Sequence, residues 1–386
     1  MKKELELYIH IPFCAKKCAY CDFLSSPQDE ETIERYVDAL IREIRAHKEY
    51  ETSHATCKVT TIFLGGGTPS ILNASQIEKI FKALRENFTI TKSAEITIEA
   101  NPGTVTKEKL ETYKHCGINR ISFGLQSANN EELKLLGRIH TYEEFLESYR
   151  LARACGFENI NVDLISAIPK QTVTSWEKTL TKVIRLNPEH ISAYSLIVED
   201  GTPFAKQYGE GCPKVDDLPS EEEERVIYYK TEELLQEAVY HRYEISNYAK
   251  DGKECQHNLG YWERKEYLGI GLGASSLIDN ARFKNTDNLE YYLKHAEQLC
   301  KIQENKEPLS MKEQMEEFMF LGLRKMQGIS EIEFAENFGQ SIEECYGVQL
   351  KQLLAEGLLQ RQGEQLMLTK RGIDVSNYVF AEFLAE

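Results

Sequence analysis

Three cysteines stand close together near the start of the chain, at Cys14, Cys18 and Cys21. They follow an alternating, strand-like segment and lie on a short loop. Iron–sulfur cubanes are normally held by four cysteines, so three close thiolates can leave one iron with an open position. A structural zinc site is the alternative, with His10 or a remote cysteine as the fourth ligand. The spacing alone is compatible with both metals.

Further residues with chemical potential follow the ends of later apolar segments. Glycines can bring backbone close to a ligand because they have no Cβ, although such a run is also typical of a plain turn. Carboxylates, amides and hydroxyls can bind charged or sugar-like groups, whereas a single acid after a strand can also be a helix cap. These candidates are Gly66, Gly67, Thr68, Glu99, Gln126, Asp163 and Ser195.

A repeated strand–helix alternation positions these residues. Leu5–Ile11 alternates as a strand, and Ile33, Tyr36, Val37, Leu40 and Ile44 then recur at helical spacing. A helix is expected from Thr106 to Gly117, a residue suited to the left-handed position after a helix. The further strands are expected at 59–64, 95–100, 121–125, 159–165 and 191–196, and further helices at 77–84, 131–136 and 176–184.

Helical connections between strands imply a parallel sheet, either open or curled into a barrel. In a barrel the carboxyl ends of the strands form one rim, where (β/α) barrels place their chemistry. An open sheet would scatter the candidates along a line. We therefore expect an α/β fold, a partial (β/α)6 TIM-like barrel, over residues 1–200.

The remaining chain is expected to form two modules. Residues 201–307 continue from the barrel and include an acidic helix from Ser220, whose Glu221–Glu224 run suits a helix N-terminus. The pattern over residues 308–386 predicts short helices followed by a hairpin at 358–369. Together these elements indicate a C-terminal α+β winged-helix-like domain. It has no basic recognition face, which favours an interaction or lid role over DNA binding.

Composition narrows the class of protein. The chain has 386 residues, is 41% hydrophobic and 28% charged, and has no apolar run long enough to span a bilayer. Its formal net charge of −16 argues against nucleic acid as a partner. No signal peptide is evident, so a cytoplasmic location is expected, with most of the ten cysteines reduced.

Several segments together resemble the radical S-adenosylmethionine (SAM) family, in the branch that contains the oxygen-independent coproporphyrinogen III oxidases and the heme chaperone HemW. The resemblance covers nearly the whole chain. The segments are YIHIPFC at 8–14 with the CxxxCxxC spacing, GGGTP at 65–69, IEANP at 98–102, SFGLQS at 122–127, LGRIH at 136–140, and NVDLI at 161–165.

The resemblance implies a [4Fe–4S] cluster on Cys14, Cys18 and Cys21, with SAM on the open iron. It assigns Gly66 and Gly67 to the methionine part of SAM, and Gln126 and Asp163 to its ribose hydroxyls. Glu99 would pair with the SAM ammonium and Arg138 with its carboxylate. Tyr8 and Tyr20 would flank the cluster and SAM, although either could be simple packing. An electron from the reduced cluster would then cleave SAM to methionine and a 5′-deoxyadenosyl radical.

Two functions remain within this branch. Residues His257–Trp262 read HNLGYW, which resembles the HNxxYW signature of the heme chaperones, and histidine is a common heme ligand. Alternatively, His257 is a hydrogen-bonded histidine and Trp262 a core anchor. The oxidases are expected to carry a cysteine where this chain has Phe23, and a longer N-terminal extension than the 13 residues before Cys14.

The preferred interpretation is a heme carrier that delivers heme to apo-hemoproteins, with respiratory clients and peripheral membrane contact through such a client. A reductant for the cluster would be a further partner, and a cluster at a surface rim could support a homodimer. The alternative is an oxidase that converts coproporphyrinogen III to protoporphyrinogen IX. A third interpretation is a zinc-stabilised barrel without radical chemistry, which would be colourless.

Overall fold

A computed structural model describes residues 3–49 and 57–384. Within these residues, one curved sheet has the strand order β12-β11-β10-β9-β1-β2-β3-β4-β5-β6-β8-β7. Strands β1 to β6 are all parallel to one another, which confirms the expected partial six-stranded barrel. Their bounds are β1 Glu4–Ile11, β2 Lys58–Gly66, β3 Ile90–Ala100, β4 Arg120–Gln126, β5 Ile160–Ser166 and β6 His190–Ser195.

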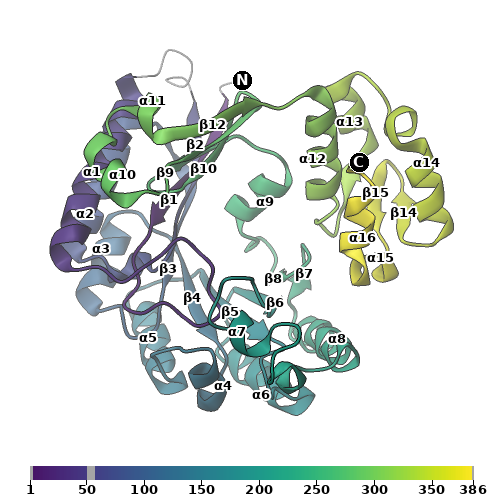
Figure 1. The fold of residues 1–386 in the computed structure, drawn as a ribbon, viewed down its shortest axis with the longest axis horizontal. Helices are drawn as coiled ribbons and strands as arrows, with labels where there is room; N and C mark the ends of the chain where they lie inside the picture. Colours follow the sequence, from purple (N-terminus) through teal and green to yellow (C-terminus); the bar gives the residue numbers. More distant parts are fainter. Residues whose placement is uncertain (1–2, 50–56, 385–386) are drawn as a thin grey trace.

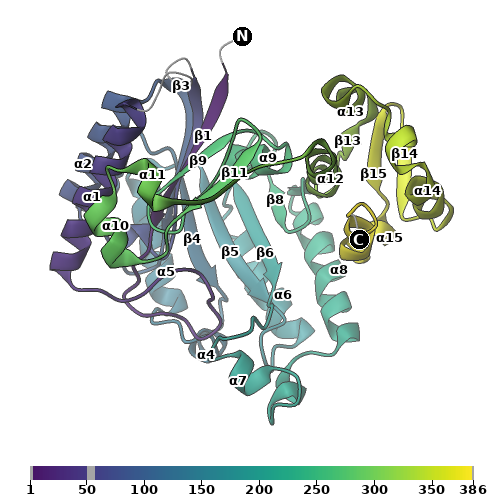
Figure 2. The same ribbon diagram turned by 45° about the horizontal axis from the view of Figure 1, so that its top comes forward.

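Helices cover the outer face of this sheet, as Figures 1 and 2 show. They are α1 Glu30–Glu49, α2 Ala74–Asn87, α3 Lys107–His115, α4 Asn130–Leu135, α5 Tyr142–Ala154 and α6 Val173–Ile184. Both expected ends of α3 are confirmed. At its start, the Thr106 side chain accepts a hydrogen bond from the Lys109 amide. After its last turn, Gly117 has a φ of +79°. The apolar stripes of these helices pack on the strands and form one continuous core.

Helix α5 was not among the expected helices. It begins after Thr141, whose side chain accepts from the Glu144 amide in a reciprocal capping box. Phe145, Tyr149 and Ala152 are buried at helical spacing. The crossover from β4 to β5 therefore contains α4 and α5, and α5 is the longer of the two.

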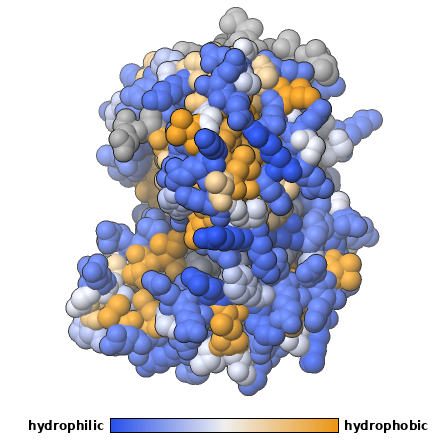
Figure 3. Space-filling model, turned by 90° about the vertical axis from the view of Figure 1, so that its right-hand side faces the viewer, coloured by the Kyte–Doolittle hydropathy of each residue, from blue (hydrophilic) through white to orange (hydrophobic). Residues whose placement is uncertain are grey.

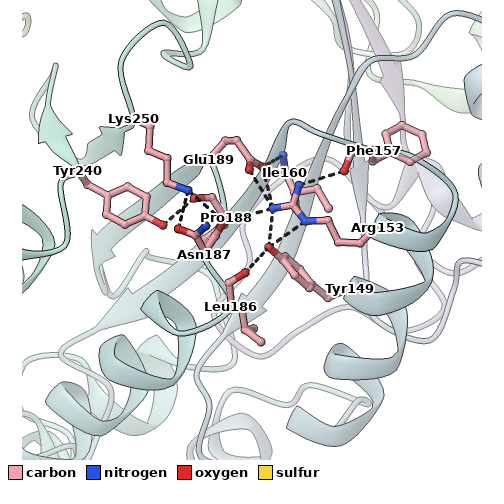
Figure 4. Close-up of polar contacts among 10 residues, drawn as sticks. All are labelled: Tyr149, Arg153, Phe157, Ile160, Leu186, Asn187, Pro188, Glu189, Tyr240 and Lys250. Atoms are coloured by element: carbon pink, nitrogen blue, oxygen red, sulfur yellow. Dashed lines mark hydrogen bonds and ion pairs between the residues drawn. The ribbon is translucent and has the colours of Figure 1, made fainter.

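A polar cluster lies at the starts of β5 and β6, at the ends of these strands opposite the candidate site (Figure 4). Arg153 on α5 lies 2.8 Å from Glu189 and also donates to the hydroxyl of Tyr149. Glu189 accepts from the Ile160 amide at the start of β5, and Tyr240 donates to the Pro188 carbonyl. These bonds tie α5, β5 and the chain before β6 to one another.

Residues 201–308 extend the same sheet at both edges. Antiparallel strands β7 His241–Arg242 and β8 Asn247–Ala249 continue from β6. On the other side, β9 Tyr267–Ile270 is parallel to β1 and leads to antiparallel β10 Ser275–Ile278, β11 Ala281–Asn285 and β12 Gln303–Pro308. The helices here are α7 Ala205–Tyr208, α8 Glu221–Glu237, α9 Gln256–Trp262, α10 Leu289–His295 and α11 Leu299–Ile302. Figure 1 shows α9 lying on the concave side of the sheet.

The C-terminal residues form a unit with its own hydrophobic core. Its elements are α12 Met311–Gly322, β13 Ile329–Ser330, α13 Glu331–Phe338, α14 Ile342–Ala355, β14 Leu359–Gln362, β15 Gln365–Leu368, α15 Lys370–Asp374 and α16 Ser376–Ala381. Strands β14 and β15 form the expected hairpin, and β13 pairs with β15 as a third strand. From the side of this unit, the surface is a mixture of polar and apolar side chains, hollowed between its upper and lower parts (Figure 3). Among the described residues, no helix is long and apolar enough to cross a membrane.

Candidate metal and cofactor site

The loop after β1 brings the three cysteines to the rim of the barrel. Cys14, Cys18 and Cys21 all line one cavity of about 410 Å³, together with the ends of β2 to β6. The Cys14 amide donates to the Ser26 carbonyl, and the Ala19 amide donates to the Leu136 carbonyl. The first bond joins the two ends of the loop, and the second attaches its middle to the residue after α4.

Two donors approach the cysteine sulfurs. The Thr68 hydroxyl donates to Cys14 Sγ at 3.4 Å, and Arg138 Nη1 donates to Cys18 Sγ at 3.4 Å. Burial raises the pKa of the Cys21 thiol. Hydrogen bonds and a neighbouring cation stabilise thiolates, which are the form that binds iron. The donor set therefore fits a cluster held by three thiolates.

The arrangement does not favour the single-zinc alternative. Within residues 3–49 and 57–384, no group of three or more His, Cys, Asp or Glu side chains is arranged to hold one metal ion. A cubane joins each thiolate to a different iron, so its three cysteines need not converge on one point.

Gly66 and Gly67 are required by the packing of the cysteine loop. A Cβ at Gly67 would lie 2.6 Å from the Phe13 carbonyl oxygen, and one at Gly66 would lie 2.5 Å from the His10 ring. Gly66 also has a φ of +111°, which side chains rarely adopt. Both glycines line the cavity, so their backbone faces the space expected for SAM.

Arg138 is held by more partners than the sequence could indicate. Its Nη2 donates to Asn101 Oδ1 at 2.6 Å and to the Gly124 carbonyl at 2.7 Å. Asn101 in turn donates to the Thr68 hydroxyl at 2.8 Å. Arg138 Nε is buried and has no hydrogen-bond partner among the described residues. Asn101 was not among the expected site residues, although it lies within the IEANP segment at 98–102.

Two carboxylates stand at the ends of β3 and β5. Glu99 accepts from the Gly66 amide at 3.1 Å, and desolvation at the cavity wall raises its pKa to about 8. Asp163 accepts from Ser122 at 2.9 Å and from Asn161 at 2.7 Å, and desolvation raises its pKa as well. The bound cation of a ligand would favour ionisation of either group.

The other expected SAM-site residues also lie at this rim. Gln126, Ser195 and Tyr20 line the same cavity. Gln126 has a φ of +72°, in the left-handed region, at an irregular register between β4 and β5. Tyr8 lies apart from them, hydrogen-bonded to His10 Nδ1 at 3.0 Å and stacked on Phe63.

A larger cavity of about 770 Å³ adjoins the first. The two share Phe23, Gly66 and Glu99 in their walls. Most of the wall is aromatic or aliphatic, and Tyr261 and Trp262 of the HNLGYW segment contribute to it from α9. The remaining residues of the wall come from β1, from the β9–β11 part of the sheet, and from α12.

His257 does not line either cavity. It is 1% exposed, and its ring is stacked on Phe63 with centroids 5.2 Å apart. Its Nδ1 is 2.7 Å from the Thr61 hydroxyl and its Nε2 is 3.0 Å from the Tyr261 hydroxyl. Burial lowers the pKa of His257 to about 3, so its imidazole is neutral at physiological pH.

Close packing places α9 against the first strands. A Cβ at Gly260 would lie 2.0 Å from Glu6 Oε1, so the absence of a side chain allows α9 to approach β1. The His257 amide donates to Glu95, which lies in the middle of β3. Cys255 is fully buried beside Glu95, and burial raises its pKa to about 12.

Comparisons with known proteins identify both parts of the chain. A model of the radical SAM superfamily matches residues 8–183, and a model of the HemN C-terminal domain matches residues 309–375. The first match contains all three cysteines and the glycine run. Membership of the superfamily implies a [4Fe–4S] cluster and SAM.

Similar proteins cover the whole chain. The heme chaperone HemW of Lactococcus lactis is 38% identical over 100% of this chain and 99% of its own length, and that of Bacillus subtilis is 36% identical over 98% and 99%. The structure of the radical SAM enzyme coproporphyrinogen III oxidase (HemN) from Escherichia coli matches with a TM-score of 0.86 at 26% identity, covering 99% of this chain and 90% of that one. The chain therefore belongs to the radical SAM superfamily and, within it, to the HemW family.

Proposed function

We propose that this protein is a heme chaperone, which binds heme and transfers it to apo-hemoproteins. The observation that carries this proposal is the cavity of about 770 Å³ lined by Tyr261 and Trp262. Its volume lies in the ordinary range for ligand sites, and its largely aromatic and aliphatic wall suits the faces of a porphyrin. The names of the full-length relatives support the same function.

The neighbouring cavity supplies the other half of the proposal. A [4Fe–4S] cluster bound by Cys14, Cys18 and Cys21 supplies one-electron chemistry to SAM once a reductant has reduced it. The chain's own residues hold the ligands and exclude water: Arg138 and Thr68 face the sulfurs, and Glu99 faces the space shared by both cavities. Heme and SAM would thus lie on either side of Gly66 and Glu99.

Axial ligation of the heme iron by His257 is part of the proposal and requires α9 to move. The imidazole is neutral, as a metal ligand must be, but both its nitrogens are hydrogen-bonded and its ring is buried. Release of the Tyr261 hydroxyl would expose Nε2 on the side of the larger cavity, whose wall contains Tyr261.

The test is a heme titration of the anaerobically reconstituted protein, followed by optical spectra. We expect stoichiometric binding with a histidine-ligand spectrum that His257→Gln removes. His115→Gln is the matched control, since His115 is exposed on α3, and it should leave the spectrum unchanged. An unchanged spectrum in His257→Gln would refute the ligand assignment, and absence of heme binding by the wild type would refute the chaperone function.

The oxidase is the second candidate, favoured by the structural match to HemN. Phe23, where an oxidase is expected to carry a further cysteine, lies in the walls of both cavities. Conversion of coproporphyrinogen III under anaerobic, reducing conditions would establish this function. The respiratory clients, a homodimer and peripheral membrane contact through a client belong to the chaperone proposal and would be tested by co-purification with loaded client.

A further inference from the structure

Arg282 is a cation in a largely apolar wall. It lies on β11 and faces the cavity of about 770 Å³, together with aromatic and aliphatic side chains such as Trp262, Leu277 and Phe320. Among the described residues of this wall, it is the only lysine or arginine. The wall's histidine, His10, has a pKa lowered by burial and adds no charge at neutral pH.

The local charges leave Arg282 with an excess of positive charge. Its Nη2 lies 2.7 Å from Glu317 Oε1, and its Nη1 donates to the Tyr267 hydroxyl at 2.9 Å. Glu317 already has a second guanidinium, because Arg264 Nε lies 2.8 Å from its other oxygen. Two guanidiniums therefore share one carboxylate, which leaves a net positive charge beside the cavity.

The two arginines differ in accessibility. The side chain of Arg264 is 11% exposed and is not part of the cavity wall, whereas that of Arg282 is 40% exposed and faces the cavity. A guanidinium has five N–H donors, and among the described residues Arg282 donates to two side chains, Tyr267 and Glu317. Arg264 neutralises Glu317, and Arg282 has donors for a further anion.

We propose that Arg282 binds a carboxylate of the ligand in this cavity. The ligand class is then a flat, largely apolar macrocycle with ionised carboxylates at its edge, and for heme the group bound is a propionate. This inference rests on the proposed heme-binding function and adds the orientation of the macrocycle: its acidic edge faces β11 and α12, and its faces lie against the aromatic wall. A planar guanidinium fork matches a carboxylate well.

The test compares heme with heme dimethyl ester, which keeps the macrocycle and iron but has no carboxylates. Both are titrated into the reconstituted full chain from the same dilute detergent. We expect the wild type to bind heme about tenfold more tightly than the ester, the range for a hydrogen bond between charged groups. Arg282→Gln should abolish this preference by weakening heme binding alone, and Arg282→Lys should keep part of it.

Arg361→Gln is the matched control, because Arg361 also pairs with glutamates, Glu331 and Glu343, but is not part of the cavity wall. It should keep the preference for heme, and urea unfolding of both variants reports any shared structural loss. A preference that survives Arg282→Gln, or an equal loss of both ligands, would overturn the inference while leaving heme binding intact. If the wild type binds neither ligand, the proposed function itself fails.

Discussion

At the residue scale, Asn101 connects the two donors that approach the cysteine sulfurs. It accepts from Arg138, which donates to Cys18, and it donates to Thr68, which donates to Cys14. Loss of its amide would free both donors at once. Asn101 is therefore a positioning residue for the cysteine loop, although the side chain itself touches no sulfur in a recorded contact.

We predict that Asn101→Ala slows SAM cleavage by about tenfold or more, since misplacing a positioning group commonly costs that much. The measurement is 5′-deoxyadenosine formation by reconstituted protein, with iron and sulfide determined per chain. Asn73→Ala is the control: Asn73 caps α2, so its loss should cost about 1 kcal/mol of stability without changing the rate per cluster. Equal rates in the two variants would contradict the role of Asn101.

The carboxyl group of Glu99 should make the affinity for SAM depend on pH. Its pKa is raised to about 8 by desolvation, so below that pH it is largely protonated and cannot attract the SAM ammonium. SAM affinity should therefore rise as the pH increases from about 6.5 through 8 and level off only above about 9. Equilibrium binding of SAM across this range checks the expectation. Glu99→Gln should bind weakly at every pH, and a variant with the wild-type pH profile would show that another group titrates.

The motifs predicted most residues of the rim, but the environment of His257 lay beyond them. Cys14, Cys18, Cys21, Gly66, Gly67 and Arg138 lie in local segments whose spacing is visible in the sequence. The burial of His257 depends on Thr61 and Tyr261, which come from β2 and from the next turn of α9. The contact with Thr61 is long-range and leaves no periodic signal along the chain.

At the element scale, α9 lies on the concave side of the sheet and contacts both the sheet and the larger cavity. His257 is hydrogen-bonded to Thr61 on β2, and Tyr261 and Trp262 line the larger cavity. His257 and Tyr261 are four residues apart and lie on the same face of α9, so the bond between them links the contact with β2 to the cavity wall. Its strength should influence how readily the imidazole becomes available.

Tyr261→Phe tests this connection because it removes one hydroxyl and keeps the aromatic ring. We predict faster appearance of the histidine-ligand heme spectrum in stopped-flow mixing, together with a loss of about 1 kcal/mol in unfolding free energy. Tyr267→Phe is the comparison in the same wall, since Tyr267 contacts Arg282 rather than His257. A rate unchanged from the wild type would mean that release of His257 is not controlled by this bond.

The cluster around Arg153 should contribute stability without affecting the site. Arg153→Met would remove the charged contacts to Glu189 shown in Figure 4, and we expect a loss of about 1–3 kcal/mol in urea unfolding. Lys107→Met removes an exposed pair with Glu111 and should cost less than about 0.5 kcal/mol. SAM cleavage per folded chain should be unchanged in both, and equal stabilities would contradict the importance of the Arg153 cluster.

Long elements with clear apolar periodicity were the predictable ones. The strands at 5–11 and 159–165 and the helix at 176–184 match β1, β5 and α6 to within a few residues. Helix α5 had comparable signals in Thr141, Glu144 and Phe145 and could have been found. Strands such as β7, with two residues, are too short for an alternating pattern and are determined by their neighbours in the sheet.

At the scale of the whole molecule, the sheet continues past the barrel on both edges. The strand–helix alternation predicted the parallel strands β1–β6, because each crossover needs a helix of visible length. It did not predict that β9–β12 join the same sheet beside β1. The larger cavity forms between this extension, α9 and α12, so its existence follows from tertiary packing.

This architecture explains how related chains can share a fold and differ in ligand. The radical SAM rim is built by the parallel strands, whereas much of the larger cavity is built by residues after Gly201. The match to HemN covers both parts, so fold alone does not decide between a carrier and an oxidase. That decision depends on what enters the larger cavity and whether it leaves unchanged.

The most direct measurement loads the anaerobically reconstituted protein with one equivalent of heme and mixes it with an apo-hemoprotein, followed by the optical spectrum of the acceptor. A parallel sample receives coproporphyrinogen III, SAM and a reductant. We predict transfer of intact heme to the acceptor and no decarboxylated porphyrinogen. Formation of protoporphyrinogen IX without stable heme binding would contradict it and make this chain an oxidase.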